Sequence, residues 1–125
     1  MATHTVTAEN IQSVVDDNGI VILDFWADWC GPCKMFAPTF ESASEQHSDI
    51  YFGKIDTQDQ QALARELNIQ SIPTLMVFRD QILIFRQAGA LRPNDFDSLI
   101  TQVMELDMDE VRAKIQEQEG QQPQQ

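Results

Sequence analysis

One unbroken apolar stretch constrains the fold more than any other feature of the sequence. Ile20–Trp26 reads IVILDFW, and Asp24 is its only polar residue. Because apolar and polar residues do not alternate, such a run is typical of a strand covered on both faces, as the central strands of α/β sheets are. The sequence therefore predicts a sheet with helices on both sides.

The segments around this strand alternate between helix and strand patterns. Apolar residues at helical spacing predict four helices: 8–17 behind a capping Thr7, 30–47, 56–67, and one from Pro93 onward. Further strands are expected at 3–6, 50–55, 74–78 and 82–86. The last two lie so close in sequence that an antiparallel hairpin is the simplest connection. The order βαβαβαββα predicts an α/β protein, a three-layer α/β/α sandwich with a mixed central sheet.

Length and charge narrow the classes of function. A chain of 125 residues can bury a core as one domain without disulfide staples, which leaves its two cysteines available for chemistry. Lys and Arg number 8 against 20 Asp and Glu, and the net charge of -12 disfavours nucleic-acid binding. The chain lacks the roughly 18-residue apolar run of a membrane span and begins with a polar segment. We therefore expect a cytoplasmic protein rather than a membrane or secreted one.

The chemistry is expected at Cys30–Cys33, which reads CGPC between the apolar strand and the next helix. In a chain with a βαβ pattern this spacing is typical of a dithiol redox motif. Cys30 is the expected nucleophile, because the free N–H groups and the dipole of a helix N-terminus stabilise a thiolate. Cys33, one turn further on, would attack the mixed disulfide and release the reduced substrate.

The two cysteines allow two other interpretations. A zinc site usually needs four ligands, and the chain offers only the two cysteines plus His4 and His47, both far from the motif in sequence; no metal is expected. Two inert core cysteines are the other possibility. Gly31 and Pro32 argue against it, because these residues expose the backbone and fix the turn at a strand-to-helix junction.

Asp24 is the second candidate for chemistry. Among apolar neighbours an ionised carboxylate costs several kcal/mol, so its pKa should rise. Such a group near Cys33 could take the proton of that thiol when Cys33 must attack. The alternative is a hydrogen-bonded structural aspartate at the end of a strand.

The segment Val21–Met35, VILDFWADWCGPCKM, closely resembles the active-site segment of thioredoxins. The resemblance continues at Ala37-Pro38, Lys54–Asp56, Ile72–Leu75 and Ala88–Ala90, and covers about residues 3 to 105. It implies the thioredoxin fold and a protein-disulfide reductase, a dithiol electron carrier that maintains cell redox homeostasis. It also implies a redox-active Cys30–Cys33 disulfide, no bound cofactor, and electrons from NADPH through thioredoxin reductase. Disulfide-containing proteins would be the substrates.

The same resemblance implies roles for further residues. Lys54 would lie near Asp24 and tune it, and the Ile72–Pro73 bond would be cis and lie against the two sulfurs, although most X-Pro bonds are trans. The backbone of Ile72 could then pair with an extended substrate. The implied substrate-binding residues are Trp29, Gly31, Pro32, Ile72, Thr74, Ala88 and Gly89.

Two features depart from the thioredoxin pattern near residue 80. Many thioredoxins place a Gly in the turn between the last two strands, whereas this turn reads Arg79-Asp80-Gln81. Asp80 must therefore take a positive φ, or the turn must loosen. The strand 82–85 is apolar on both faces although the resemblance places it at a sheet edge, where such a strand invites pairing with another chain.

The composition changes after Met104, and we divide the chain accordingly. Residues 1–105 form a thioredoxin domain, 106–119 an acidic helical extension and 120–125 a disordered Gln-rich tail. Apolar residues at helical spacing predict a longer last helix or a second one capped by Asp107 or Asp109. This extension either stays solvated, covers apolar surface near the edge strand, or forms a homodimer or partner contact through residues 100–119.

Two alternatives to a reductase follow from these features. One is an oxidant or isomerase of the same fold, which a His in place of Pro32 would favour by stabilising the thiolate of Cys30. The other is a thioredoxin-fold binding or chaperone module that recruits a partner through the C-terminal extension.

Overall fold

A five-stranded mixed sheet organises the chain, which a computed structural model describes from residue 2 to residue 121. The strands are β1 (Thr3–Thr5), β2 (Ile20–Trp26), β3 (Tyr51–Asp56), β4 (Thr74–Arg79) and β5 (Ile82–Ala88). The helices are α1 (Ile11–Asp17), α2 (Gly31–Gln46), α3 (Gln61–Glu66), α4 (Pro93–Glu105) and α5 (Met108–Gln121). In the order β1-β3-β2-β4-β5, β3 is parallel to β1 and β2, and β4 is antiparallel to β2 and β5. The predicted mixed α/β sheet is confirmed.

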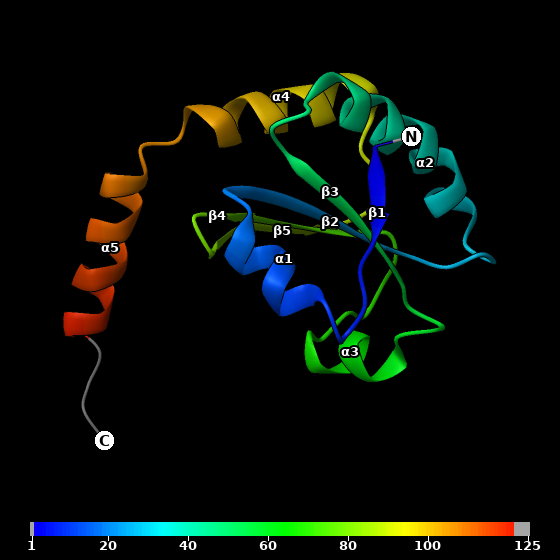
Figure 1. Cartoon of the computed structure of the whole chain (residues 1–125), viewed down its shortest axis with the longest axis horizontal. Coiled ribbons are helices and arrows are strands. Elements are labelled where there is room, and N and C mark those ends of the chain that lie inside the picture. Colours follow the sequence, from blue (N-terminus) through cyan, green and yellow to red (C-terminus); the bar gives the residue numbers. More distant parts are fainter. Residues whose placement is uncertain (1, 122–125) are drawn as a thin grey trace.

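Helices cover both faces of the sheet, with α2 and α4 on one side and α1 and α3 on the other (Figure 1). Side chains of β2 alternate between two cores: Ile22 joins the core under α2 and α4, whereas Leu23 and Phe25 join the one beside α1 and α3. The first core is built on phenylalanines, with Phe36 and Phe96 packed edge to face. Burying each such ring contributes about 1.5–3 kcal/mol. The prediction of a strand covered on both faces is confirmed.

Two helices begin later than their patterns predict, because side chains hydrogen-bond to the backbone in the turns that precede them. The N-cap residue of α1 is Asn10 and not Thr7: Thr7 Oγ1 accepts the N–H of Glu9 at 3.3 Å and Asn10 Oδ1 accepts the N–H of Thr7 at 2.7 Å, so these contacts close a separate turn before α1 begins at Ile11. The helix expected from Asp56 begins only at Gln61, since Asp56 Oδ1 accepts the backbone N–H of Gln58 at 2.9 Å. Both corrections concern local hydrogen bonds that compete with helix formation.

The β4–β5 turn contains two residues in the left-handed region, Asp80 with φ 51° and Gln81 with φ 70°. The expectation for Asp80 is confirmed, and Gln81 shares the strain. Neighbouring segments hold the turn in place: the N–H of Asp80 donates to the carbonyl of Gly19 at 2.8 Å, and Gln81 Nε2 donates to the carbonyl of Asp16 at 3.1 Å. The turn is thereby tied to the chain that leads from α1 into β2.

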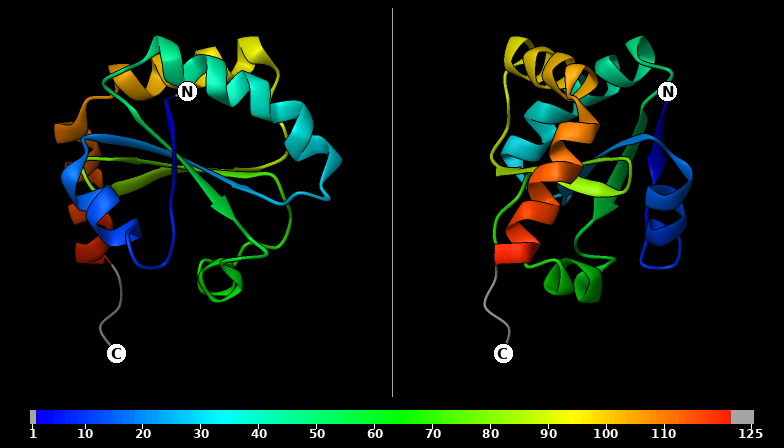
Figure 2. Two further views of the ribbon diagram at one scale, coloured as in Figure 1. Left: turned by 45° about the vertical axis from the view of Figure 1, so that its right-hand side comes forward. Right: turned by 90° about the vertical axis from the view of Figure 1, so that its left-hand side faces the viewer.

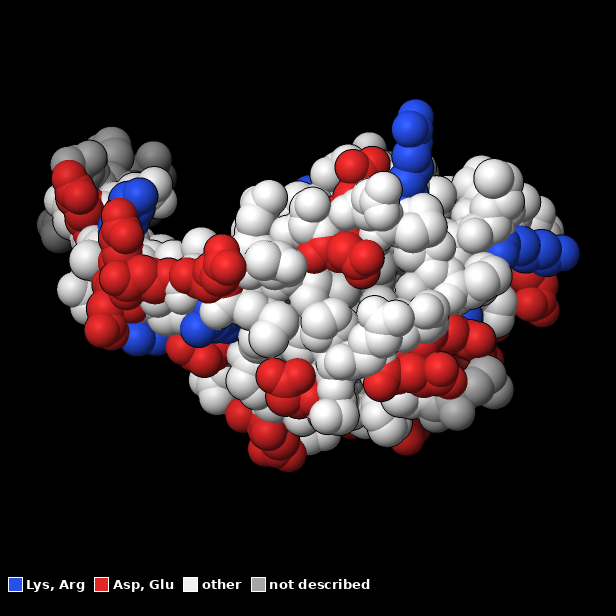
Figure 3. Space-filling model, turned by 90° about the horizontal axis from the view of Figure 1, so that it is seen from above, with Lys and Arg blue, Asp and Glu red and all other residues white. Residues whose placement is uncertain are grey.

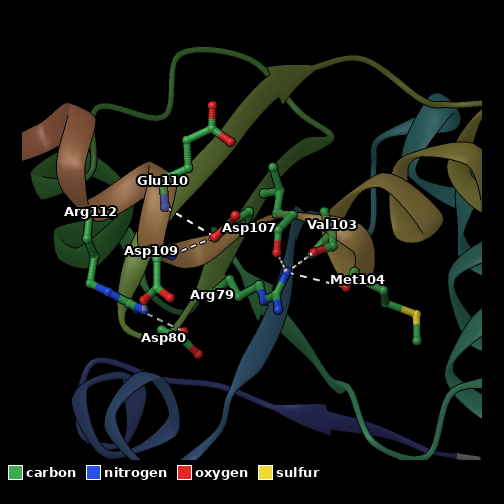
Figure 4. A network of polar contacts seen from close by, with 9 residues as sticks. Arg79, Asp80, Val103, Met104, Asp107, Asp109, Glu110 and Arg112 are labelled. Atoms are coloured by element: carbon green, nitrogen blue, oxygen red, sulfur yellow. Dashed lines mark hydrogen bonds and ion pairs between the residues drawn. The ribbon is translucent and has the colours of Figure 1, made fainter.

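The last helix is two helices, and the joint between them is closed by polar contacts (Figure 4). Asp107 caps α5, because its Oδ1 accepts the backbone N–H groups of Asp109 and Glu110 at 3.1 and 3.2 Å. The stripe therefore continues as a second helix. α5 extends to Gln121, the second residue of the segment 120–125 that is expected to be a disordered tail; residues 122–125 lie outside the described residues.

Residues at the β4–β5 turn bond to both helices at this joint, α4 and α5. Arg79 Nη1 donates to the carbonyl oxygens of Val103 and Leu106, both at 2.7 Å, and so closes the C-terminal end of α4. Its neighbour Asp80 pairs with Arg112 of α5 at 3.2 Å. Two consecutive residues of the hairpin thus hold α4 and α5 (Figure 4).

α5 lies at the end of the molecule opposite the N-terminal end of α2, beside the β4–β5 turn (Figures 1 and 2). Seen from above, acidic side chains crowd the surface that α5 forms (Figure 3). Met108 is buried at the start of α5, but Leu83 on the edge strand is still 44% exposed. Within residues 2–121, none of the helices combines the length and the apolar character needed to cross a membrane.

Candidate active site

The two cysteines lie where the chain passes from β2 into α2. Cys30 is the N-cap residue of α2 and Cys33 is in its first turn, and a disulfide joins them across a Cα–Cα distance of 5.2 Å. The backbone N–H of Cys33 points at Cys30 Sγ, 3.2 Å away. Once the disulfide is reduced, this N–H and the helix dipole favour a thiolate at Cys30. The geometry is that of a nucleophile and a second thiol held within reach of it.

A second loop presses against the sulfurs. The Ile72–Pro73 bond is cis, as the resemblance implies, and the carbonyl oxygen of Ile72 lies 3.7 Å from Cys30 Sγ. The carbonyl of Pro73 accepts the N–H of Gly89 at 2.8 Å. The structure thus brings the CGPC segment, the cis-proline loop and the end of β5 together.

The predicted substrate-binding residues differ in accessibility. Trp29 is 67% exposed, and Gly31, Pro32, Ala88 and Gly89 are also exposed around the disulfide. Ile72 is half-buried against the cysteines. Thr74 does not fit the expectation: it is 3% exposed and its hydroxyl donates to the carbonyl of Ser71, so it stabilises its own loop. Its side chain is a poor candidate for substrate contact.

Apolar hollows flank the disulfide on two sides. One, of about 290 Å³, is lined by Trp29, Ile69 and Ile72 together with Thr57, Ala64, Gln70 and Ser71. The other, of about 220 Å³, is lined by Met35, Phe36, Thr39, Ala90, Leu91, Arg92 and Pro93. Sequence reasoning missed Met35, although it is 79% exposed; an apolar residue outside the helical stripe was the available signal. Such hollows suit apolar side chains of a bound protein segment.

Asp24 is buried without a hydrogen bond. It is 1% exposed, and neither carboxyl oxygen has a partner among the residues that the structure describes. Burial raises the pKa of Asp24 from 3.8 to about 7, and the positive charge of Lys54 opposes part of that rise. The direction of this shift is the expected one, and no side chain or backbone group of the described residues bonds to the Asp24 carboxyl group as the structural alternative would require.

Strand register places Asp24 and Lys54 side by side. They are Cα partners in the parallel β2–β3 pair, so both side chains point to the same face of the sheet. Alternation from Ile22 makes this the face covered by α2, whose first turn carries Cys33. Across residues 2–121, no three His, Cys, Asp or Glu side chains gather as a metal ion would require.

The family model described as Thioredoxin matches residues 2–105. The chain belongs to the thioredoxin family. It is 48% identical over 120 residues to a Streptomyces coelicolor protein named as thioredoxin 2, an alignment that covers 96% of this chain and 90% of the relative. A thioredoxin of Chlamydia caviae is 42% identical over 95 residues, 76% of this chain and 89% of its own.

Solved structures agree with this assignment. A thioredoxin variant from Halobacterium salinarum superposes with a TM-score of 0.77 at 35% identity, covering 84% of this chain and 93% of that one. A Malassezia sympodialis thioredoxin gives 0.72 at 33% identity, with 80% and 89% covered. With its Cys30–Cys33 disulfide, this thioredoxin-family chain is a dithiol redox carrier and a protein-disulfide oxidoreductase.

The comparisons also single out α5, because the thioredoxin model ends at residue 105, before α5 begins. The Streptomyces coelicolor alignment leaves out only five of the 125 residues, so nearly all of α5 lies inside it. The segment of α5 therefore lies beyond the matched family model but within the alignment to this relative.

Proposed function

We propose that the protein reduces disulfides of other proteins, with Cys30 as nucleophile and Cys33 as the resolving thiol. The observation that carries this proposal is the N–H of Cys33 directed at Cys30 Sγ in the first turn of α2. The Cys30 thiolate attacks one sulfur of the substrate disulfide, forms a mixed disulfide and expels the other sulfur as a thiolate. The Cys33 thiolate then attacks Cys30 Sγ, so that the Cys30–Cys33 disulfide forms and the second substrate sulfur leaves. Two electrons pass to the substrate.

Asp24 accepts the proton that Cys33 must lose in the second step. With a pKa of about 7, about half of its carboxyl groups are ionised at neutral pH and ready to accept a proton. Lys54, by lowering that pKa, raises the ionised fraction. Burial on the α2 face of the sheet supports this assignment, because a carboxyl group is rarely buried without a partner unless its proton is used.

The substrate binds as an extended segment across the exposed rim. Its backbone pairs with that of Ile72, whose neighbour Pro73 contributes no N–H of its own. Its side chains enter the apolar hollows beside Trp29 and Met35. Gly31, Pro32, Ala88 and Gly89 allow close approach to the sulfurs, because their side chains are small or absent.

The oxidised pair must be reduced again after each turn. We assign this step to a flavin-dependent thioredoxin reductase that draws on NADPH, because the chain holds only the two electrons of its dithiol. The supporting observation is the solvent-facing rim, which any second protein can reach through Trp29. A reducing compartment, the cytoplasm, provides that supply.

We divide the chain into a thioredoxin domain, residues 1–105, and an added helical segment that braces it. α5 is seated by Met108, which is buried, and by the pairing of Arg112 with Asp80. These contacts support an intramolecular brace of the β4–β5 turn over a homodimer or partner contact through residues 100–119. No observation favours the alternative of a binding or chaperone module.

Trapping and redox titration test the proposed reaction. Cys33→Ser protein should accumulate a mixed disulfide with a disulfide-containing protein such as oxidised insulin, and Cys30→Ser protein should not. Mass spectrometry of the non-reduced mixture detects the adduct. Equilibration of the wild-type pair in glutathione buffers should leave it oxidised where glutathione is largely reduced. A pair that stays reduced there would make the protein an oxidant or isomerase.

A further inference from the structure

Trp26 contacts two parts of the site, the cysteine cluster and Lys54. It is half-buried, and it packs against the cluster of Ala27, Cys30 and Cys33. The Nζ atom of Lys54 lies over its ring, 5.0 Å from the centroid, which is within the range of a cation–π contact. One aromatic side chain therefore packs against the cysteine cluster and also lies under the cation.

The same cation faces Asp24. Trp26 lies two residues after Asp24 on β2, so both side chains project from one face, and Lys54 is the register partner of Asp24 on β3. A long, flexible lysine can turn its ammonium group into solvent. The ring of Trp26 offers that ammonium a second attractive surface on the side of the sheet where Asp24 lies.

A pocket beside the Trp26 ring shows which other charged or titratable side chains lie near Lys54. It measures about 130 Å³ and is lined by Thr3, His4, Thr5, Trp26, Lys54 and Asp56. Asp56 is engaged by the backbone N–H of Gln58, and the His4 ring stacks on Tyr51 at 4.5 Å. The helices over this face add no buried charge: α2 buries Cys33, Phe36, Phe40, Ala43 and Ser44, and α4 buries Phe96, Ile100 and Val103.

We propose that Trp26 is a positioning residue for the reduction step: its ring holds the Lys54 ammonium on the side of the sheet where Asp24 lies and couples this pair to the cysteine cluster on which it packs. The inference rests on the proposed role of Asp24 as proton acceptor. It assigns to Trp26 a task beyond filling the core, because the ring sets how strongly Lys54 favours the ionised carboxylate. Proton uptake from Cys33 then depends on an aromatic residue that itself carries no titratable group.

The sign of one titration shift separates this role from simple packing. Replacing Trp26 by Leu removes the ring, so Lys54 moves away and the pKa of Asp24 should rise by about half a unit above its wild-type value. A purely structural role predicts the opposite direction, because the smaller side chain admits water and relieves the desolvation of Asp24. Trp26→Phe, which keeps a smaller aromatic face, should lie close to wild type.

The measurement is a carbon-13 NMR titration of the Asp24 carboxyl group in the oxidised protein. It is made for wild type, Trp26→Leu, Trp26→Phe, Lys54→Met and the double variant Trp26→Leu, Lys54→Met. Lys54→Met should raise the pKa of Asp24 at least as far as Trp26→Leu does, and the double variant should go no further. His4→Gln is the matched control, since His4 lines the same pocket as Trp26 and Lys54 but is not their partner.

Two outcomes would overturn the inference: an unchanged or lowered Asp24 titration in Trp26→Leu, or an equal upward shift when Trp26 is replaced in the Lys54→Met background. If Trp26→Leu does not fold, Trp26→Met in the two backgrounds gives the same comparison, since it also removes the ring. Failure of the proposed function looks different. In that case Asp24→Asn releases substrate from the mixed disulfide as fast as wild type, whatever the titrations show.

Discussion

Near the junction of β2 and α2, neither carboxyl oxygen of Asp24 has a hydrogen-bond partner among the described residues. The Nε1 atom of Trp26 also lacks one. At the opposite end of the sheet, Arg79 donates to the carbonyl oxygens of Val103 and Leu106. A buried polar group without a partner costs about 1–3 kcal/mol, more if it is charged. Polar groups thus lack partners where we propose that a proton moves, and they have partners where two helices are joined.

The largest effect should come from removing the unmet carboxyl group. In the unfolded chain Asp24 loses its proton near pH 4, but in the folded protein near pH 7, so between these values folding binds a proton and stability falls as pH rises. Three pKa units correspond to about 4 kcal/mol. At pH 8 the free energy of unfolding of Asp24→Asn should therefore exceed that of wild type by up to that amount, and the variant should unfold at a higher urea concentration. Substrate release should be slower in the same variant.

Urea unfolding at pH 4 and pH 8 measures this effect. The advantage of Asp24→Asn should be small at pH 4, where folded and unfolded wild type are both mostly protonated. An exposed aspartate, Asp28, offers the matched control as Asp28→Asn. An advantage of equal size at both pH values would show that Asp24 is not a desolvated acid.

The opposite end should respond in the other direction. Arg79→Met removes the donor that closes α4 and leaves the carbonyl oxygens of Val103 and Leu106 without it. We expect a loss of about 2 kcal/mol, since hydrogen bonds to charged groups contribute about 1.5–3 kcal/mol each and this site is only partly buried. Activity should be unchanged, because the site lies at the other end of the sheet (Figure 1).

Thermal unfolding and insulin reduction together check this prediction. Lys114→Met is the control, because Lys114 is exposed and its ion pair among residues 2–121 is with Glu110, one helical turn away at 3.7 Å. If Arg79→Met matched Lys114→Met in Tm, the joint would not depend on Arg79. If it lost reductase activity while still folded, the two ends would not be independent.

The smallest effect should come from the strained turn itself. Gln81 has φ 70°, which costs a side-chain-bearing residue about 1 kcal/mol or more, and glycine adopts it freely. Gln81→Gly also creates the Asp-Gly pair that two-residue hairpins favour. It gives up one exposed hydrogen bond to Asp16, so the net gain in unfolding free energy should be about 0.5 kcal/mol.

Chemical denaturation resolves a gain of this size when wild type and variant are measured side by side. Gln81→Ala is the comparison that isolates the backbone, since it loses the same hydrogen bond without gaining conformational freedom. Equal stability of the Gly and Ala variants would mean that the turn is not strained at this position.

What the sequence predicts well is local or framed by a continuous pattern. The run Ile20–Trp26 predicts the central strand, and Asp24 within it predicts the raised pKa, because burial follows from the neighbours in the chain. The position of both cysteines at the start of a helix is also predictable, because the CGPC segment and the helical pattern that follows it are adjacent in sequence.

What it misses depends on contacts across the fold or on competing hydrogen bonds. Thr7 is predicted as the cap of α1, but its hydroxyl closes a turn that precedes the helix, and Thr74 is predicted to contact substrate, but its hydroxyl donates to the carbonyl of Ser71. Arg79 carries no sequence signal at all, since its partners are more than twenty residues away. Residues that act within one element are predictable, whereas residues that join elements need the structure.

The placement of α5 also determines how this carrier can be held. α5 and the N-terminal end of α2 lie at opposite ends of the long axis of the molecule (Figure 1). A chain attached to an electrode or a bead through the exposed side of α5 would present its disulfide outward, in one orientation. Such an array would exchange electrons with dissolved proteins while every molecule stayed anchored.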